Sequence, residues 1–329
     1  MSKPLLEALS LRSLPHPPLW IMRQAGRYLP EYREIRERHS FREAVSTPEL
    51  AAEITLQPIR RFGMDAAVIF ADIMTPLEAM GVEMTFDPGP RLVARTVSEV
   101  TELPDLDPSG VAFVAETIRI VREQVPAQTS VIGFAGAPVT LLAYLLEGGG
   151  SKDFMTMRGA LRADPLGAAA ALDKLARSMS AYLRVQVEAG ADVVQVFDTW
   201  AGLLDQGTFE RFAVPAASRS LEGVAAPTIY FAPGAGHALS SQLGVGATGY
   251  GVDWRVPIDE ALDRLRGHAV QGNLDPATLL TDPETITTEV KEILHRVDGR
   301  PGHIMNLGHG IDRHTPIENV AAFVSAVRS

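Results

Sequence analysis

Short apolar runs rich in β-branched residues recur along the chain, and each is followed by a loop and then by a longer amphipathic segment. This alternation is typical of repeated strand–helix units, because buried parallel strands are short and apolar while the covering helices repeat with the period of an α-helix. The pattern predicts about eight strands, over residues 19–22, 66–70, 130–135, 192–197, 228–231, 248–252, 268–271 and 303–306.

Helix signals separate these strands. Pro48 suits the first turn of a predicted helix over residues 47–62, and Pro58 should kink that helix. Ser46 or Thr47 can cap its first turn. Further helices are predicted over residues 164–190 and 258–266 and from residue 315 onward. Residues 83–97 have a centre rich in proline and glycine and predict a surface hairpin instead.

No change in composition marks a linker, so we expect the 329 residues to form a single domain over residues 1–329. Strands that alternate with helices predict a single-domain (β/α)8 barrel, and a doubly wound open sheet is the alternative. Polar side chains follow the predicted strands, namely Arg23, Asp72, Asp198, Thr199, Asp253, Asn273 and His309. Because the carboxyl ends of barrel strands converge, this placement favours the barrel and predicts an active site at its C-terminal rim.

Composition narrows the class of protein. Hydrophobic residues make up 46% of the chain and charged residues 21%, as in a folded globular protein. No apolar run is long enough for a membrane helix, and the first residues lack the pattern of a signal peptide, so we expect a cytoplasmic protein without membrane partners. The absence of cysteine excludes disulfides, thiolate nucleophiles and zinc–thiolate sites. A net charge of -10 argues against a nucleic-acid partner.

Arginine is concentrated near the first predicted strand despite this negative charge. Residues 23–42 contain six arginines, Arg23, Arg27, Arg33, Arg36, Arg38 and Arg42. Arg23 and Arg27 are four residues apart, so their guanidinium groups project to one side of a turn, and Gly26 lets a ligand approach the backbone. Such a pair suits carboxylates. The alternative is a solvated surface in which the arginines pair with the neighbouring Glu31, Glu34 and Glu37.

Three other side chains are candidates for chemistry. Asp72 is surrounded by apolar residues after a predicted strand, where a carboxylate is either structurally paired or functional, and the strand end favours function. Tyr144, on the helix after the glycine-rich segment 133–138, would by residue type alone more often belong to a core. His309 lies between glycines, and a single histidine is more often structural. His303 begins the strand that precedes His309, so the two should lie at opposite ends and form no metal site.

Several segments carry a resemblance to a known family. Arg-Gln-Ala-Gly-Arg-Tyr-Leu-Pro at 23–30 and Gly-Phe-Ala-Gly-Ala-Pro at 133–138 are similar to the two signature segments of the uroporphyrinogen decarboxylase family. Shorter matches follow in the family's order at 56–58, 70–73, 272–276 and 306–310. The resemblance runs through almost the entire chain.

The resemblance implies a homodimeric (β/α)8 barrel that converts uroporphyrinogen III into coproporphyrinogen III by decarboxylating four acetate side chains, without a metal or an organic cofactor. By motif match, Arg23 and Arg27 should bind carboxylates and Asp72 should accept hydrogen bonds from the pyrrole N–H groups. These three residues are the expected catalytic set. Tyr144, Thr199 and His309 should complete the substrate site. Thr199 stands where many relatives have serine, and residues 311–314 depart from the family's usual proline-containing loop.

Two competing functions remain after this resemblance. A corrinoid-dependent methyltransferase shares the expected barrel, but related enzymes hold zinc with histidine and cysteine, and this chain has no cysteine. A non-catalytic tetrapyrrole carrier would also need the arginines and a cleft. It would gain little from an aspartate beneath a polyacid, because like charges repel. Turnover of the tetrapyrrole separates the carrier from the decarboxylase.

Overall fold

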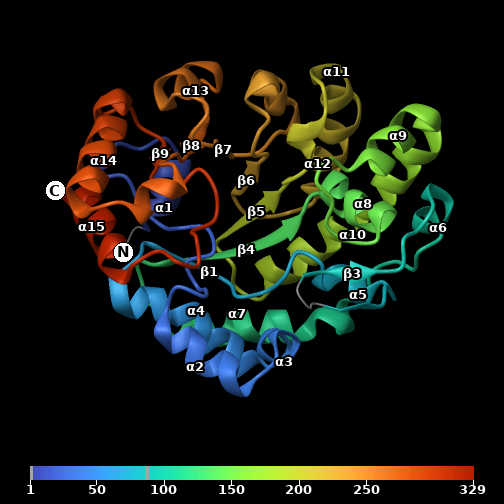
Figure 1. Ribbon diagram of the computed structural model, residues 1–329, viewed down its shortest axis with the longest axis horizontal. Coiled ribbons are helices and arrows are strands. Elements are labelled where there is room, and N and C mark those ends of the chain that lie inside the picture. Colours follow the sequence, from blue (N-terminus) through green and yellow to red (C-terminus); the bar gives the residue numbers. More distant parts are fainter. Residues whose placement is uncertain (1–2, 86–88) are drawn as a thin grey trace.

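A computed structural model describes residues 3–85 and 89–329. Its centre is a seven-stranded parallel sheet in the order β1-β4-β5-β6-β7-β8-β9, which curls so that helices cover its outer face (Figure 1). The strands are β1 (Ala66–Val68), β4 (Ser130–Gly136), β5 (Val193–Phe197), β6 (Thr228–Phe231), β7 (Gly249–Gly251), β8 (Ala269–Gln271) and β9 (His303–Ile304). All seven lie within strands that the apolar runs predict or extend them by one residue, which confirms these predictions.

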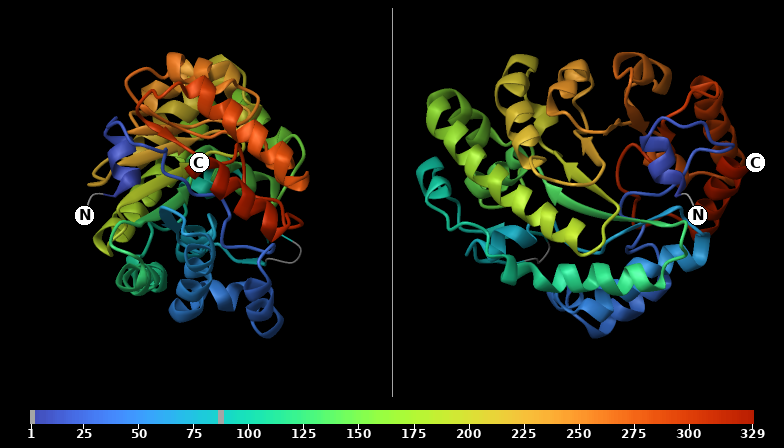
Figure 2. Two further views of the ribbon diagram at one scale, coloured as in Figure 1. Left: turned by 90° about the vertical axis from the view of Figure 1, so that its left-hand side faces the viewer. Right: turned by 180° about the vertical axis from the view of Figure 1, so that it is seen from behind.

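Helices follow the strands in sequence and pack around the sheet, as the two further views show (Figure 2). The first group comprises α1 (Pro4–Leu9), α2 (Pro30–Arg38), α3 (Phe41–Ser46), α4 (Pro48–Phe62), α5 (Thr75–Ala79), α6 (Val97–Thr101), α7 (Ala112–Gln124) and α8 (Pro138–Glu147). The second group comprises α9 (Met155–Ala163), α10 (Pro165–Glu188), α11 (Gln206–Thr208), α12 (Val214–Ser220), α13 (Ile258–Arg264), α14 (Pro283–Val297) and α15 (Ile317–Arg328). Among the described helices, none is both long and apolar enough to cross a bilayer.

The segment 19–22 differs from its predicted strand. Only Leu19 pairs with a neighbouring strand segment, in a parallel bridge to Met305 beyond the end of β9. On its other side, Leu19 donates its N–H to the Asp65 side chain, at 2.8 Å, and accepts from the Asp65 N–H, at 2.9 Å. A side chain therefore replaces part of the ladder, and a turn with Arg23 at a φ of 63° ends the extended segment. A regular eighth strand was a wrong prediction for this segment.

Side chains alternate between two apolar cores along the strands. Ile132 and Phe134 on β4 belong to an inner cluster, whereas Val131 and Ala135 belong to the outer cluster between sheet and helices. This is the two-residue period of a sheet that is buried on both faces. The inner cluster also contains residues of α1, where Leu9 lies against the start of β7. Helix α1 therefore covers the amino ends of the strands and leaves their carboxyl ends open.

The local predictions for helices and turns are largely confirmed. Helix α4 begins at Pro48 as predicted, although neither Ser46 nor Thr47 caps it with a side chain. Helix α10 begins at Pro165, where Asp164 accepts from the Gly167 N–H at 2.9 Å. The predicted hairpin exists as the antiparallel pair β2 (Met84–Thr85) and β3 (Arg91–Leu92), and part of its predicted turn lies outside the described residues.

Candidate active site

A cavity of about 880 Å³ opens at the carboxyl ends of the strands. Its apolar wall includes Phe134, Phe197 and Phe231, which come from the neighbouring strands β4, β5 and β6. Phe197 makes edge contacts with both other rings, with ring centres 5.6 Å from Phe134 and 6.3 Å from Phe231. Aromatic rings near the carboxyl ends of three paired strands give the cavity a rigid apolar surface.

A chain of buried polar side chains links three strand segments within the sheet. The Trp20 indole N–H donates to Gln271 Oε1 at 3.0 Å, and Gln271 Nε2 donates to Gln195 Oε1 at 3.1 Å. All three side chains are fully or almost fully buried. Trp20 also lines the cavity, so this chain fixes one part of the cavity wall to β8 and β5. Buried polar side chains that satisfy one another in this way hold a single arrangement.

Arg23 and Arg27, which the sequence predicts to bind carboxylates as a pair, both line the cavity. Arg23 lies against Gly310, where a Cβ atom would be 2.5 Å from Arg23 Cδ. Within the described residues neither arginine forms an ion pair, and Glu31 pairs with Arg61 instead, at 2.8 Å. The alternative of a surface neutralised by the neighbouring glutamates therefore does not describe these two side chains.

Arg36 is a third arginine on the cavity wall, and its guanidinium is held in place by neutral groups. Its Nε donates to the His39 carbonyl at 3.1 Å, and Nη1 donates to the Tyr32 hydroxyl at 3.2 Å. The same guanidinium lies over the rings of Tyr32 and Phe41, at 6.0 and 5.4 Å from their centres. These contacts orient Arg36 but leave its charge uncompensated by any described carboxylate.

Asp72 lies on the cavity wall shortly after β1. Its Oδ1 accepts from the Met74 N–H at 2.8 Å, which fixes the carboxylate. Burial raises the pKa of Asp72, while the bond from Met74 and the positive charge of Arg23 lower it. The carboxylate therefore has one oxygen held by the backbone, and a nearby cation would favour its ionised form.

Thr199 and His309 also line this cavity, whereas Tyr144 is not among its lining residues. Tyr144 packs edge-on against Phe154 and Trp200, with ring centres 5.9 and 6.1 Å apart. Burial raises the pKa of its hydroxyl, and the negative charge of Asp72 adds to that rise. Burial lowers the pKa of His309, and the charges of nearby arginines lower it further, so the imidazole is neutral near pH 7.

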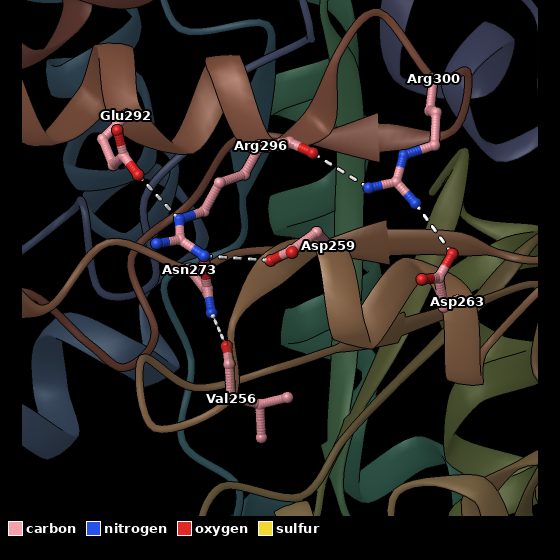
Figure 3. A network of polar contacts seen from close by, with 7 residues as sticks. All are labelled: Val256, Asp259, Asp263, Asn273, Glu292, Arg296 and Arg300. Atoms are coloured by element: carbon pink, nitrogen blue, oxygen red, sulfur yellow. Dashed lines mark hydrogen bonds and ion pairs between the residues drawn. The ribbon is translucent and has the colours of Figure 1, made fainter.

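Three other strand-end residues have structural partners instead. Asp198 accepts from the hydroxyls of Thr140, at 2.8 Å, and Tyr230, at 2.7 Å, and burial raises its pKa to about 6. Asp253 accepts from both the backbone and the side chain of Arg255. Asn273 donates to the carbonyls of Asp253 and Val256, at 2.9 and 2.6 Å; Figure 3 shows the bond to Val256. None of the three lines the cavity.

Sequence reasoning missed the apolar part of the site. The phenylalanines near the carboxyl ends of β4, β5 and β6 have the sequence context of ordinary strand residues. Only their alternation along the strands indicates that they share one face of the sheet. Trp254 was also missed; it lines the cavity beneath Arg255, whose guanidinium lies 4.2 Å from the ring centre. The loop with residues 275–277 and Leu280 was a further omission.

Together, the curled parallel sheet and a cation-rich cavity at its carboxyl ends define an α/β enzyme scaffold for an anionic ligand. The sequence model of the uroporphyrinogen decarboxylase family matches residues 1–329, and the chain belongs to that family. This confirms the predicted membership and, with it, membership of a family of carboxy-lyases.

Named relatives agree with this assignment. The uroporphyrinogen decarboxylase of Carboxydothermus hydrogenoformans is 43% identical, over 99% of this chain and 96% of its own length. That of Syntrophotalea carbinolica is 45% identical, over 96% of this chain and 94% of its own length. A solved methyltransferase from Methanosarcina mazei superposes with a TM-score of 0.83 over 98% of this chain and 97% of its own, at 22% identity. At that identity the likeness describes the fold alone.

Proposed function

We propose that the chain catalyses the decarboxylation of the four acetate side chains of uroporphyrinogen III to give coproporphyrinogen III. One observation carries the proposal: a fixed carboxylate, Asp72, shares a cavity with arginines that have no ion-pair partner among the described residues. A polyacid with a nitrogen-rich centre is complementary to that arrangement, because its arms need cations and its pyrrole N–H groups need an acceptor.

Chemically, each step replaces a carboxylate by a proton. Protonation of a pyrrole carbon creates a conjugated iminium, which takes up the electron pair when the bond to the carboxylate breaks and carbon dioxide leaves. A second proton then converts the exocyclic methylene into a methyl group, and the ring loses the proton it had gained. The substrate supplies its own electron sink, so the chain must supply position and charge.

In this proposal Asp72 is the counter-charge of the cationic ring. Its raised pKa reflects burial, and a positive ring against the carboxylate would draw that pKa down and keep Asp72 ionised when it is needed. Arginine is a poor general acid by its ordinary pKa. Arg23 and Arg27 are therefore assigned chiefly to carboxylate binding, next to Asp72 in the catalytic set, and Arg36 adds a third cation.

The remaining predicted contacts complete the proposed substrate site. Thr199 and His309 offer a hydroxyl and a neutral imidazole on the cavity wall, and both would orient the substrate. Tyr144 on α8 stays in the predicted set as a substrate contact, although its ring packs against Phe154 and Trp200 and does not line the described cavity. We also propose that the chain forms a single-domain (β/α)8 barrel in which the irregular segment 19–22 takes the position of the eighth strand. Its contacts with Met305 and Asp65 support this proposal.

The proposed reaction is tested by anaerobic incubation of the purified chain with uroporphyrinogen. The expected result is release of carbon dioxide and a shift from eight carboxyl groups toward four, measured by chromatography after oxidation of the products to porphyrins. Tight binding without release of carbon dioxide would favour the carrier instead. Sedimentation in the same buffer tests the homodimer that the resemblance implies, and fractionation of the source cells tests the expected cytoplasmic location.

A further inference from the structure

The net charge of the cavity wall depends on Arg313, a residue that has no role in the proposed function so far. Among the described lining residues are the four arginines Arg23, Arg27, Arg36 and Arg313 and the three aspartates Asp72, Asp275 and Asp312. Without Arg313 these positive and negative charges would be equal in number. Arg313 therefore gives the cavity wall its net positive charge. A positive wall favours a polyanion such as the proposed substrate.

Arg313 belongs to a loop that the backbone fixes beside Arg23. The Ile311 N–H donates to the Met22 carbonyl at 2.9 Å, which ties the loop to the residue before Arg23. Gly310 lies against the Arg23 side chain, with no room there for a Cβ atom. The loop is therefore attached to the segment that carries the predicted carboxylate pair, and Arg313 faces the same cavity.

The neighbouring carboxylate of Asp312 forms a hydrogen bond within its own turn. Asp312 Oδ1 accepts from the His314 N–H at 2.8 Å, so it stabilises the turn. Arg313 donates from Nε to His314 Nε2 at 3.0 Å, which leaves the terminal Nη1 and Nη2 groups for a ligand. Within residues 3–85 and 89–329, no ion pair involves Arg313. An oriented guanidinium with free terminal nitrogens is the side chain that best binds a carboxylate.

We propose that Arg313 binds one carboxylate arm of the substrate and adds a subsite to those of Arg23 and Arg27. This inference rests on the proposed function. The arm is either an acetate, which the reaction removes, or a propionate, which it leaves. As long as the arm that Arg313 holds is not the reacting one, a cation there stabilises ground state and transition state alike, so Arg313 acts on the Michaelis constant and not on turnover.

The test compares Arg313→Gln with the wild-type chain in anaerobic steady-state kinetics. We expect the KM for uroporphyrinogen to rise about tenfold, the range of one charge-assisted hydrogen bond, with kcat within about twofold of wild type. Arg33→Gln is the matched control, because Arg33 is exposed on α2 and does not line the cavity. Arg313→Lys keeps the charge without the fork, and its KM should lie between those of wild type and Arg313→Gln.

The same variants identify the arm. A KM effect that declines as the substrate loses acetates, from eight carboxyls to five, assigns Arg313 to an acetate, and a constant effect assigns it to a propionate. An Arg313→Gln chain with normal circular dichroism and a KM within twofold of wild type would overturn the inference, as would a Lys variant no better than Gln. Failure of the wild-type chain to release carbon dioxide would instead reject the proposed function.

Discussion

Arginines occur in two contrasting settings in this molecule. Arg296 on α14 pairs with Glu292 at 3.0 Å and with Asp259 at 3.4 Å, and Arg300, just after α14, pairs with Asp263 at 3.0 Å, so each outer guanidinium meets a carboxylate (Figure 3). In the cavity, by contrast, Arg23 and Arg27 have no such partner in the described part of the chain.

The comparison shows that arginines paired with carboxylates can be distinguished from unpaired ones only in the folded structure. Both settings place carboxylates close in sequence to the arginines, so sequence spacing alone does not distinguish them. Around α14 the acids belong to the same helix and to its neighbour α13, and the charges neutralise one another in solvent. At the cavity, Glu31 is used by Arg61, and the cations near the strand ends remain uncompensated. These unpaired cations are available to a ligand of opposite charge.

The largest expected effect comes from removing the single negative charge assigned to the reacting ring. Asp72→Asn should lower kcat about 10²- to 10³-fold, because the ring cation loses its counter-charge, while the amide oxygen can still accept from Met74. Asp275→Asn is the matched control, because its carboxylate also lines the cavity and also accepts from the N–H two residues on, that of Ala277, but is assigned no contact with the reacting ring. Retention of more than about a tenth of the activity, a barrier change of about 1.4 kcal/mol or less, would contradict the assignment.

A smaller effect is expected from the cavity arginines, and here the comparison can be tested directly. Arg27→Ala should raise the KM about tenfold to a hundredfold, because a charge-assisted hydrogen bond to a carboxylate is lost. Arg300→Ala, just after α14, is the control and should leave the KM unchanged. The measurement is steady-state kinetics at several salt concentrations, where the wild-type KM should rise with salt more steeply than that of Arg27→Ala. A normal KM for Arg27→Ala would remove the carboxylate-binding role.

The strands and long helices were predictable because their signals are local. Apolar runs marked all seven strands of the sheet, and the prolines that open α4 and α10 marked helix starts. The segment 19–22 was not predictable as a single bridge, because the Asp65 side chain that bonds to Leu19 is distant in sequence. Pairing of that kind depends on the packed fold and has no periodic signal.

The site was predictable only in part for a related reason. Asp72 and Asp198 both follow strands and have apolar neighbours, yet only Asp72 lines the cavity. Asp198 accepts hydrogen bonds from the hydroxyls of Thr140 on α8 and Tyr230 on β6, and no residue near Asp198 in the sequence indicates these partners. Residue type and strand position thus identified candidate acids, while the partners that decide their roles came from elements far along the chain.

The raised pKa of the buried Asp198 should make the free energy of unfolding depend on pH. Its pKa of about 6 in the fold lies above its ordinary value, so the folded chain binds this proton more tightly than the unfolded chain. The contribution of Asp198 to the free energy of unfolding therefore falls as pH rises from about 4 to about 6, by about 1.4 kcal/mol per pH unit. The measurement is urea unfolding of wild type and Asp198→Asn at pH 5 and pH 7. Relative to the variant, the free energy of unfolding of wild type should be about 1.4 kcal/mol higher at pH 5 than at pH 7. An equal difference at both pH values would mean that Asp198 titrates normally.

The smallest effect is expected at the outer network. Arg296→Ala removes both the bond to Glu292 and the longer contact with Asp259, but these side chains are well exposed to solvent. Water solvates the carboxylates that remain, so the free energy of unfolding should fall by less than about 1 kcal/mol, and kcat and KM should not change. Urea unfolding and kinetics on the same preparation measure both. A change in KM at this distance from the cavity would show that paired arginines also influence the site, and the distinction between paired and unpaired arginines would then fail.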